Sequence, residues 1–249
     1  MPEKILKLTD TFWNIRGSFR IGGLLDIGTQ CSLVRLRAGG YVLLDSYTLS
    51  EATLDEVRGV TDGGRDVTAI LNLHPFHTLH VRKAHAQFPN ARLYGTSRHR
   101  RVAPELPWAP ELTEDESFHA LYADDFDFSV PRGVAFVPSN ENLHFSSVLA
   151  FHRESRTLHV DDTLNWAPFP FGGVGLHPTL SYVLDPRPGA AAELRAWGEG
   201  LAARCADVDH LCTAHFGAAP ALDGSLGAKV GAALRGVERT LAAHAKKYG

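Results

Sequence analysis

The chain has 249 residues and a formal net charge of −3, with 25 Lys and Arg against 28 Asp and Glu. Its hydrophobic fraction of 44% and charged fraction of 21% are typical of a globular protein that buries a substantial core. The small negative charge and the absence of a basic stripe argue against nucleic-acid binding. The densest basic run, Arg98-His99-Arg100-Arg101, is short, and we expect it to be a solvated turn.

From the sequence we expect neither a membrane span nor export of the protein. No stretch approaches the roughly 18 apolar residues that a membrane span needs. The N-terminal residues MPEKILKLTD are charged where a signal peptide would be apolar. Cys31, Cys205 and Cys212 are too few and too scattered for a disulfide framework. We therefore expect a cytoplasmic protein with buried thiols and no membrane partner.

The N-terminal third of the sequence predicts mainly β-strands. Residues that favour strands occupy 12–19 and 31–36 and are separated by a glycine-containing polar loop. Residues 41–45 form a short apolar run that ends in a carboxylate. Ser50 then precedes an amphipathic stretch over 52–60, which predicts a helix.

A strand–helix–strand unit is expected next. Residues 66–73 are almost continuously apolar, as in a strand that is covered on both faces. Thr78 is a suitable N-cap for a helix that ends near residue 88, and 91–94 predicts a further strand. This order predicts a parallel βαβ unit.

The second half of the sequence begins with a segment, 103–130, that is rich in Pro, Asp and Glu and predicts a surface excursion. After it we expect strands at 133–138, 146–152, 157–161 and 208–214, a turn at 153–156, a loop over 165–178, and helices at 190–204 and 226–247. There is no internal repeat and no long linker. A single domain over residues 1–249 is the simplest arrangement.

The sequence contains 13 histidines, more than an average composition would supply. His74, His77 and His80 lie in HPFHTLH, directly after the apolar run that ends at Leu73. Neither a helix nor a strand lets three rings at this spacing converge, whereas a loop does. Imidazole is a common ligand of zinc and iron, so this segment is a candidate metal loop. The alternative is that the rings cap helix ends or pack in the core.

Five segments resemble the metallo-β-lactamase superfamily, in the same order along the chain and over about residues 10–220. They are YVLLDS, HPFHTLH, SNENLHFSSVLAF, SRTLHVDDTLN and CTAHFG. The resemblance implies an α/β protein with the αββα sandwich, and metal ligands drawn from His74, His77, His80, His144, Asp162 and His215. It also implies that Asp45 and Ser46 lie beneath the metals. FPNARLYGTSRHRRVAPELPW and FHRESRTLHVDDTLN resemble a bacterial branch of this superfamily.

The histidine loop departs from the family pattern H-x-H-x-D-H. Counted back from His80, Leu79 occupies the position of the Asp, and His74 is displaced by one residue. The ligand sets that the resemblance leaves are His80, Asp162 and His215 for one ion, and His77 and His144 with His74 or Asp162 for the other. We therefore expect one or two divalent metal ions, with zinc as the first choice and iron or manganese as alternatives.

A metal with an open coordination position implies hydrolysis by a metal-bound water, of a small ester, lactone, amide or phosphoester. Without an Asp in the loop, the general base would be Asp162, Asp161 or the metal hydroxide itself, and Asp162 is the catalytic residue we expect. For Asp161 a surface position is favoured, because adjacent strand residues point to opposite faces. Asn165, Trp166, Phe169 and Phe171 follow Asp162 and form either an apolar lid over a small-molecule substrate or core packing.

Other classes of function are weaker or remain open. No G-x-S-x-G elbow is present for a serine hydrolase, and no G-x-G-x-x-G for a nucleotide-binding oxidoreductase. A non-catalytic member of the same fold, metal-binding or metal-free, remains an alternative because Leu79 neither binds metal nor accepts a proton. The histidines outside the motifs are expected on the surface or on helix faces, namely His85, His99, His119, His152, His210 and His244.

Overall fold

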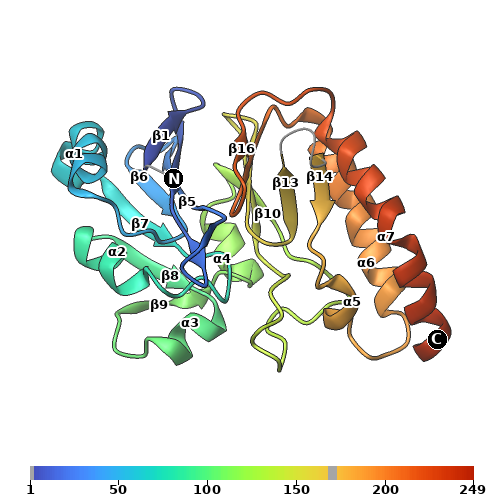
Figure 1. Cartoon of the computed structure of the whole chain (residues 1–249). Helices are drawn as coiled ribbons and strands as arrows, with labels where there is room; N and C mark the ends of the chain where they lie inside the picture. The colour runs from blue at the N-terminus through green and yellow to red at the C-terminus, as the bar shows by residue number, and fades with distance from the viewer. Residues whose placement is uncertain (1–2, 168–172) are drawn as a thin grey trace. The chain divides into compact units, whose positions relative to one another are not determined.

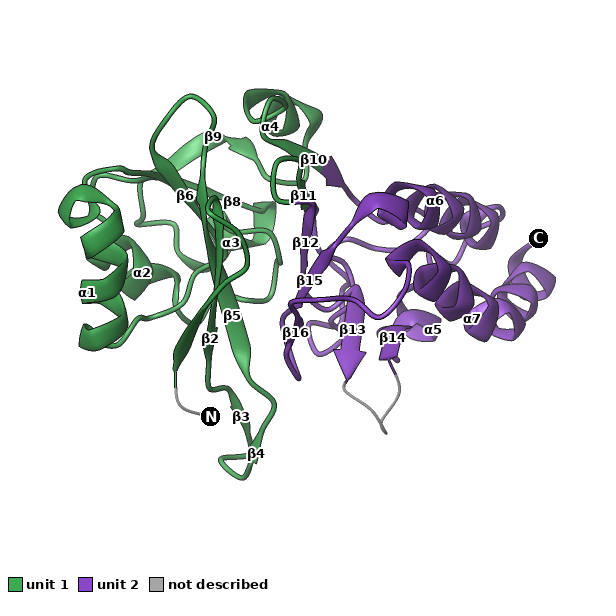
Figure 2. Cartoon of the chain, turned by 90° about the horizontal axis from the view of Figure 1, so that it is seen from above, with its two compact units in different colours: residues 1–127, 151–155 green, residues 128–150, 156–249 purple. Residues whose placement is uncertain are grey.

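The computed structural model describes residues 3–167 and 173–249. The chain divides into two compact units, which Figure 2 shows in different colours. Unit 1 comprises residues 1–127 and 151–155, and unit 2 comprises residues 128–150 and 156–249. The division passes through two strands, β10 (Phe126–Ser129) and β11 (Leu149–His152).

Unit 1 contains a seven-stranded sheet with the order β1-β2-β5-β6-β7-β8-β9. The strands are β1 (Lys4–Lys7), β2 (Phe12–Gly17), β5 (Thr29–Arg35), β6 (Tyr41–Leu44), β7 (Val67–Leu71), β8 (Arg92–Gly95) and β9 (Trp108–Leu112). Neighbours from β1 to β6 pair antiparallel, and neighbours from β6 to β9 pair parallel. A small hairpin, β3 (Arg20–Ile21) and β4 (Leu25–Asp26), stands apart from this sheet.

The helices of unit 1 are α1 (Glu51–Val60), α2 (Val81–Gln87), α3 (Ser97–Val102) and α4 (Glu116–Leu121), with a short 3-10 turn at Asp62–Gly64. Ser50 begins α1 because its side chain accepts the N–H of Thr53. Leu54 of α1 and Val81 of α2 join the buried cluster that includes Ile70 of β7. Helices α1 and α2 therefore bury their apolar faces in the same core beside the sheet (Figure 1).

Unit 2 is built on the five-stranded sheet β10-β11-β12-β15-β16 and a separate hairpin. The remaining strands are β12 (Thr157–Val160), β15 (His210–Thr213) and β16 (Ala218–Ala219), and the hairpin is β13 (Leu164–Ala167) with β14 (Gly173–Leu176). The helices are α5 (Leu180–Val183), α6 (Ala190–Arg204) and α7 (Leu226–Tyr248), with a 3-10 turn at Cys205–Asp207. Helices α6 and α7 lie side by side, and Leu194 and Leu241 contribute to the buried cluster of this unit (Figure 1).

Several predicted elements are confirmed. The helices expected at 52–60, 190–204 and 226–247 are α1, α6 and α7, and the βαβ unit at 66–94 is β7, α2 and β8. None of the described helices combines the length and the apolar composition needed to cross a lipid bilayer.

Four sequence predictions of local structure are wrong. The basic run at 98–101 lies in helix α3 rather than in a turn, and residues 133–138 form only an isolated bridge. The expected loop at 165–178 contains the β13–β14 hairpin, and the excursion at 103–130 contains β9, α4 and β10. Strand β9 tolerates Pro110 because it is the last strand of its sheet, where a missing N–H breaks no ladder.

Two of the histidines expected on the surface or on helix faces are buried, His99 in helix α3 and His152 at the end of strand β11. His99 and His152 are each only 1% exposed. The ring of His152 lies 5.7 Å from that of Phe12 and 5.2 Å from that of Phe126. Its Nδ1 accepts the backbone N–H of Ser155, so the neutral ring carries its proton on Nε2. Burial lowers the pKa of His152 to about 4, and the charge of Arg37 acts in the same direction.

The depressed pKa of His152 predicts a loss of stability on acidification. The folded pKa of about 4 lies below the unfolded value of 6.5, so protons bind preferentially to the unfolded chain between these values. This contribution to stability is complete above about pH 6.5 and falls as the pH drops towards about 4. We expect His152→Asn to reduce the difference in unfolding free energy between about pH 7.5 and about pH 5 by about 2 kcal/mol, measured by urea denaturation. A variant with the same pH dependence as the wild type would contradict this expectation.

The contact between α6 and α7 generates a second prediction. A Cβ at Gly227 would lie 2.4 Å from the carbonyl oxygen of Ala202, a backbone atom that cannot turn away. We expect Gly227→Ala to lower the free energy of unfolding by about 1–3 kcal/mol. The matched control is Gly236→Ala in the same helix, where no atom of the described residues lies within 4 Å of a new Cβ. The control should be neutral or stabilising by up to about 1 kcal/mol, and equal effects of both variants in urea denaturation would contradict the prediction.

Candidate metal centre

The carboxyl ends of the parallel strands β6, β7 and β8 lie at one edge of the sheet in unit 1, and side chains connect them. Asp45, directly after β6, accepts the backbone N–H of Leu73 at 2.8 Å through Oδ1. Ser46 donates to Asn72 Oδ1 at 2.6 Å, and the amide of Asn72 donates to the carbonyl of Tyr94 at 2.8 Å. Asp45 and Ser46 therefore fix the residues that follow β7 and lead into the histidine loop.

The first two histidines of the loop stack on each other. The ring centroids of His74 and His77 are 4.1 Å apart. His74 is fully buried, and its Nδ1 accepts the N–H of Phe76 at 3.2 Å. In a neutral ring this places the proton on Nε2, so His74 offers a lone pair to a metal only if that hydrogen bond is given up. His77 is half-buried and is the better placed of the two as a ligand.

His80 lies at the N-cap of α2, and Leu79 beside it is 72% exposed. His80 Nδ1 is 2.8 Å from the hydroxyl of Thr48. Burial lowers the pKa of His80, and His77 and Lys83 lower it further, so the ring is kept in the neutral form that binds metal.

Helix α3 holds the histidine loop from the side. The guanidinium of Arg98 donates to the carbonyl of Pro75 at 3.1 Å and lies 4.6 Å from the ring centroid of Phe76. His99 Nδ1 lies 2.9 Å from the hydroxyl of Thr96 at the start of α3, and burial lowers the pKa of His99 to about 3. The basic run that the sequence placed in a solvated turn therefore supports the loop of candidate ligands.

Unit 2 brings together three of the residues predicted as ligands. Asp162 follows β12, His215 lies two residues beyond β15, and His144 precedes the buried segment 145–148. His144 Nδ1 lies 3.7 Å from Asp162 Oδ2, and His215 Nε2 lies 3.4 Å from Asp162 Oδ1. The two histidines thus approach opposite oxygens of one carboxylate, which is 1% exposed.

The hydrogen bonding of His144 indicates which nitrogen is available to a metal. Its Nε2 lies 3.2 Å from the carbonyl oxygen of Glu141, which can only accept. In the neutral ring Nε2 therefore carries the proton, and the lone pair lies on Nδ1, the nitrogen that faces Asp162. The lone pair and the carboxylate repel each other, and a cation or a further proton between the two atoms would remove this repulsion.

Hydroxyl groups of three threonines fix the backbone on which these side chains stand. Thr163 donates to the carbonyl of residue 145 at 2.8 Å and accepts the N–H of Ser147 at 2.9 Å, which joins the end of β12 to the segment after His144. Thr179 donates to the carbonyl of His144 at 2.5 Å. The hydroxyl of Thr213 lies 2.9 Å from the carbonyl oxygen of His215 and 2.8 Å from that of Gly217, so its one hydrogen is shared between these two acceptors. The positions of the three predicted ligands therefore depend on local hydrogen bonds rather than on loop packing alone.

Each of the two histidines is spaced from Asp162 as two ligands of one divalent metal ion are spaced. Two ligand atoms bound at about 2.0–2.1 Å at the tetrahedral angle lie roughly 3.4 Å apart. The separations of 3.4 Å and 3.7 Å at Asp162 are close to this value. Two imidazole nitrogens and a carboxylate oxygen suit zinc, and they also suit iron and manganese.

The hairpin β13–β14 brings one predicted substrate-binding residue close to His215. A Cβ at Gly217 would lie 3.1 Å from the ring of Trp166, so this ring packs on the backbone two residues after His215. Asn165 and Trp166 are half-buried, whereas Phe169 and Phe171 lie outside the described residues. Phe216, which no sequence motif singled out, is 53% exposed and has a left-handed backbone with φ of 62°. Trp166 and Phe216 place apolar surface beside a candidate ligand.

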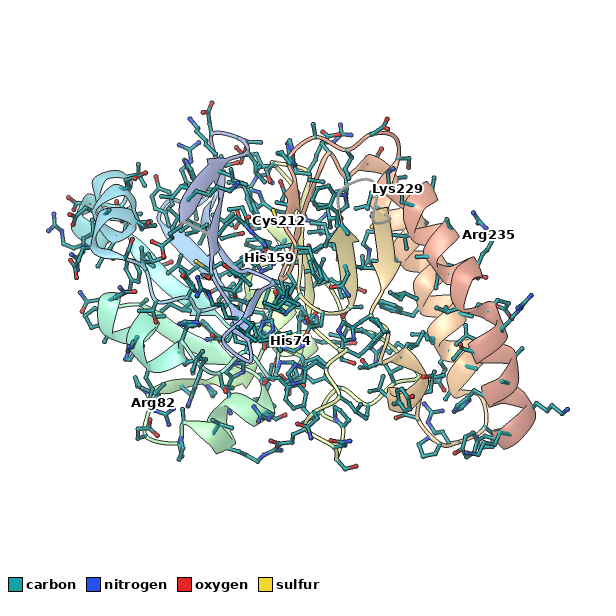
Figure 3. All side chains as sticks on the ribbon, in the orientation of Figure 1. His74, Arg82, His159, Cys212, Lys229 and Arg235 are labelled. Atoms are coloured by element: carbon teal, nitrogen blue, oxygen red, sulfur yellow. The ribbon has the colours of Figure 1, made fainter. Side chains whose placement is uncertain are left out.

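Asp161 is buried, contrary to the surface position expected for it, because β12 is covered on both faces. Asp161 is 2% exposed and His159 is fully buried. His159 pairs in register with Cys212 on the parallel strand β15, and Figure 3 labels both side chains. The interior of unit 2 therefore contains two buried titratable side chains in addition to Asp162.

His177 was also overlooked. It directly follows β14 and interacts electrostatically with Asp162, His144 and His215. Its position after a strand, like the positions of Asp162 and His215, could have marked it as a candidate ligand. The sequence predicted an irregular loop over 165–178, so the strand before His177 was not expected.

The geometry at Asp162 generates a third prediction, concerning metal content. We expect zinc to raise the Tm of the wild-type protein, because an ion that binds only the folded state adds stability. Asp162→Ala and His144→Ala should each bind less metal, measured by elemental analysis, and should lose most of that rise. His244→Ala, which removes a histidine from α7, is the matched control and should keep both. A zinc-dependent Tm that is the same in all four proteins would contradict the assignment.

Comparisons with known proteins concern the fold. No family model and no curated protein matches the sequence. A metallo-β-lactamase from Erythrobacter litoralis superposes with a TM-score of 0.63 at 14% identity, over 95% of this chain and 96% of that chain. The mono-zinc form of the metallo-β-lactamase FIM-1 from Pseudomonas aeruginosa gives 0.61 at 12% identity, over 97% of each chain. A metallo-β-lactamase from Pontibacter korlensis superposes with a TM-score of 0.56 at 14% identity, over 94% of this chain and 99% of that chain. The α/β class and the αββα type predicted from the sequence are therefore confirmed, and the chain has the metallo-β-lactamase fold.

Proposed function

We propose that the protein is a metal-dependent hydrolase of a small ester, lactone, amide or phosphoester. The observation that carries this proposal is the buried carboxylate of Asp162, which has His144 and His215 at its two oxygens. A divalent ion bound there supplies a water of lowered pKa and polarises a carbonyl or phosphoryl oxygen. Zinc is the ion we favour, in keeping with a neighbour of the same fold that is described in a mono-zinc form.

The roles of the protein groups follow from their surroundings. His144 Nε2 donates to the carbonyl oxygen of Glu141, which leaves the lone pair on Nδ1. In this proposal His144 is a metal ligand through Nδ1. Asp162 holds a ligand position and accepts or orients the proton of the attacking water. Of the loop histidines, His77 and His80 remain further candidate ligands, and His74 joins them only with a change of hydrogen bonding.

Substrate contacts are proposed for the surface next to His215. Trp166 and the exposed Phe216 offer apolar contact area, and Asn165 offers an amide that can hydrogen-bond a polar substituent. This combination suits a small molecule with little charge. We propose a cytoplasmic location, which is supported by the burial of the three cysteines, all within the described part of the chain.

A non-catalytic role is the second candidate, and Leu79 is the observation that favours it. The side chain at the position where the family pattern has a carboxylate is apolar and 72% exposed. It can neither bind a second ion nor hold a water molecule. The loss of such a group can reduce the rate by a hundredfold or more, about 3 kcal/mol of activation free energy.

The fourth prediction separates the two candidates. We expect zinc-loaded protein to hydrolyse at least one member of a panel of small esters, lactones, amides and phosphoesters. Asp162→Ala should lower kcat/KM by about a hundredfold or more, because both a ligand and the proton acceptor are lost. The matched control is Asp209→Asn, an exposed aspartate of the same unit, which should keep wild-type activity.

Two outcomes would reject the hydrolase proposal. Turnover that survives both chelation and Asp162→Ala would come from another site or from a contaminant. No turnover on any substrate class, with the metal fully bound, would favour the non-catalytic candidate.

A further inference from the structure

Unit 2 contains a cavity that shares no residue with the candidate metal centre. It has a volume of about 690 Å³ and lies where α5 and the C-terminal half of α7 meet the segment 135–139. The two helices lie next to each other in Figures 1 and 2. Small-molecule sites in proteins commonly have volumes of about 300–1,000 Å³. The volume of this cavity therefore suits an organic molecule rather than a single ion.

The inner wall of the cavity is fixed by backbone hydrogen bonds. The N–H of Ala135 donates to the carbonyl of Val183 at 3.0 Å, and the N–H of Asp185 donates to the carbonyl of Gly133 at 3.1 Å. Val183 lines the cavity and also belongs to the buried apolar cluster of unit 2. This wall is therefore preformed, and a ligand can bind without first ordering it.

The lining has a surplus of positive charge. Arg239 and Lys247 line the cavity, are exposed, and form no ion pair with a carboxylate in the part of the chain that the structure describes. Asp185 is the only acidic residue in the described lining, and it shares the guanidinium of Arg187 with Glu193. The helix dipole favours a cation at Lys247, in the last turn of α7, but Arg239 lies more than two turns before the helix ends. Helix stability therefore does not account for Arg239.

Aromatic and apolar surface lies beside these cations. Tyr182 of α5 is 74% exposed and lines the cavity together with Tyr248 and Ala243 of α7. The ring of Tyr248 lies 4.7 Å from that of His244, and Lys247 Nζ lies 4.8 Å from its centroid, so the ring has neighbours that hold it in place. Tyrosine rings offer flat apolar contact area with few rotatable bonds. The lining thus combines cationic groups with flat apolar surface.

We propose that this cavity binds a small organic anion in which a carboxylate, phosphate or sulfonate is joined to an aromatic group. Arg239 provides a fork of N–H donors that matches the oxygens of such an anion, and Lys247 adds a second positive charge. Tyr182 and Tyr248 contact the aromatic part. An inorganic anion would leave most of the cavity unfilled, and a neutral molecule would leave both cations unmatched. The inference goes beyond the proposed function, because it concerns a different site and a different ligand.

Fluorescence titration of the full-length protein with 1-anilinonaphthalene-8-sulfonate tests the proposal. This probe joins a sulfonate to aromatic rings, and its emission rises in apolar surroundings. Arg239→Gln should weaken binding by about tenfold or more, and Lys247→Gln by about threefold or more, because each removes a charge-assisted contact. The matched control is Arg235→Gln, which removes a cation of the same helix that lies outside the cavity lining (Figure 3). It should bind the probe as the wild type does.

Two further measurements test the apolar part of the ligand. Ala243→Trp places an indole in the cavity and should weaken binding of the probe by about tenfold or more, although both cations remain. Phenyl phosphate should displace the probe at a concentration about tenfold lower than inorganic phosphate or benzyl alcohol, because it alone has both the charge and the ring. Unfolding midpoints in urea establish that each variant is folded.

Several results would overturn the proposal. Absence of probe binding would do so, and so would equal binding by the wild type, Arg239→Gln and Ala243→Trp, since the probe would then lie elsewhere. Equal displacement by inorganic phosphate and phenyl phosphate would mean that charge alone explains binding. Asp162→Ala, titrated in the presence of a chelator, should keep wild-type affinity for the probe whatever the outcome for the hydrolase proposal. Loss of binding in this variant alone would assign the probe to the candidate metal centre and overturn the inference.

Discussion

The carboxylate of Asp162 is the group on which the chemistry of this protein depends. A carboxylate that is 1% exposed loses its hydration, and this cost must be offset by cations or by hydrogen-bond donors close to its oxygens. His144 and His215 approach one oxygen each, at 3.7 Å and 3.4 Å. These nitrogens are candidate donor atoms for a metal ion, and a bound cation would compensate the buried charge. Stability and metal binding therefore depend on the same few side chains.

Local hydrogen bonds, rather than large apolar contacts, set the geometry around that carboxylate. Thr163, Thr179 and Thr213 each use a hydroxyl to hold a carbonyl next to a candidate ligand. The tautomer of His144 is set in a similar way by a backbone group, because Nε2 faces the carbonyl oxygen of Glu141. The tautomer of a histidine decides which of its nitrogens can bind metal.

The histidine loop of unit 1 is fixed by different means. Asp45 has a left-handed backbone with φ of 60° and accepts the N–H of Leu73, so a strained residue anchors the strand end before His74. Arg98 then holds the loop from helix α3 through the carbonyl of Pro75 and the ring of Phe76. The abundance of histidine in this sequence thus has two origins, since some rings are candidate ligands and others are buried supports.

The sequence alone determined the order of the elements and most of the residues that carry the candidate chemistry. Helices α1, α6 and α7 and the βαβ unit follow from the spacing of apolar residues and from capping, which depend on near neighbours in the chain. The grouping of His144, Asp162 and His215 in unit 2 followed from motifs that each come at or close after a strand end, or directly before a buried segment.

Only the tertiary structure decided the roles that depend on contacts between distant segments. The burial of His152, the support of the loop by α3 and the link from Thr179 to His144 join residues that no local pattern relates. His177 is 15 positions beyond Asp162, and the β13–β14 hairpin returns the chain to the candidate metal centre. Periodicity reports which face of an element is apolar, whereas the partner of a polar atom is set by strand register and by the path of the chain in space.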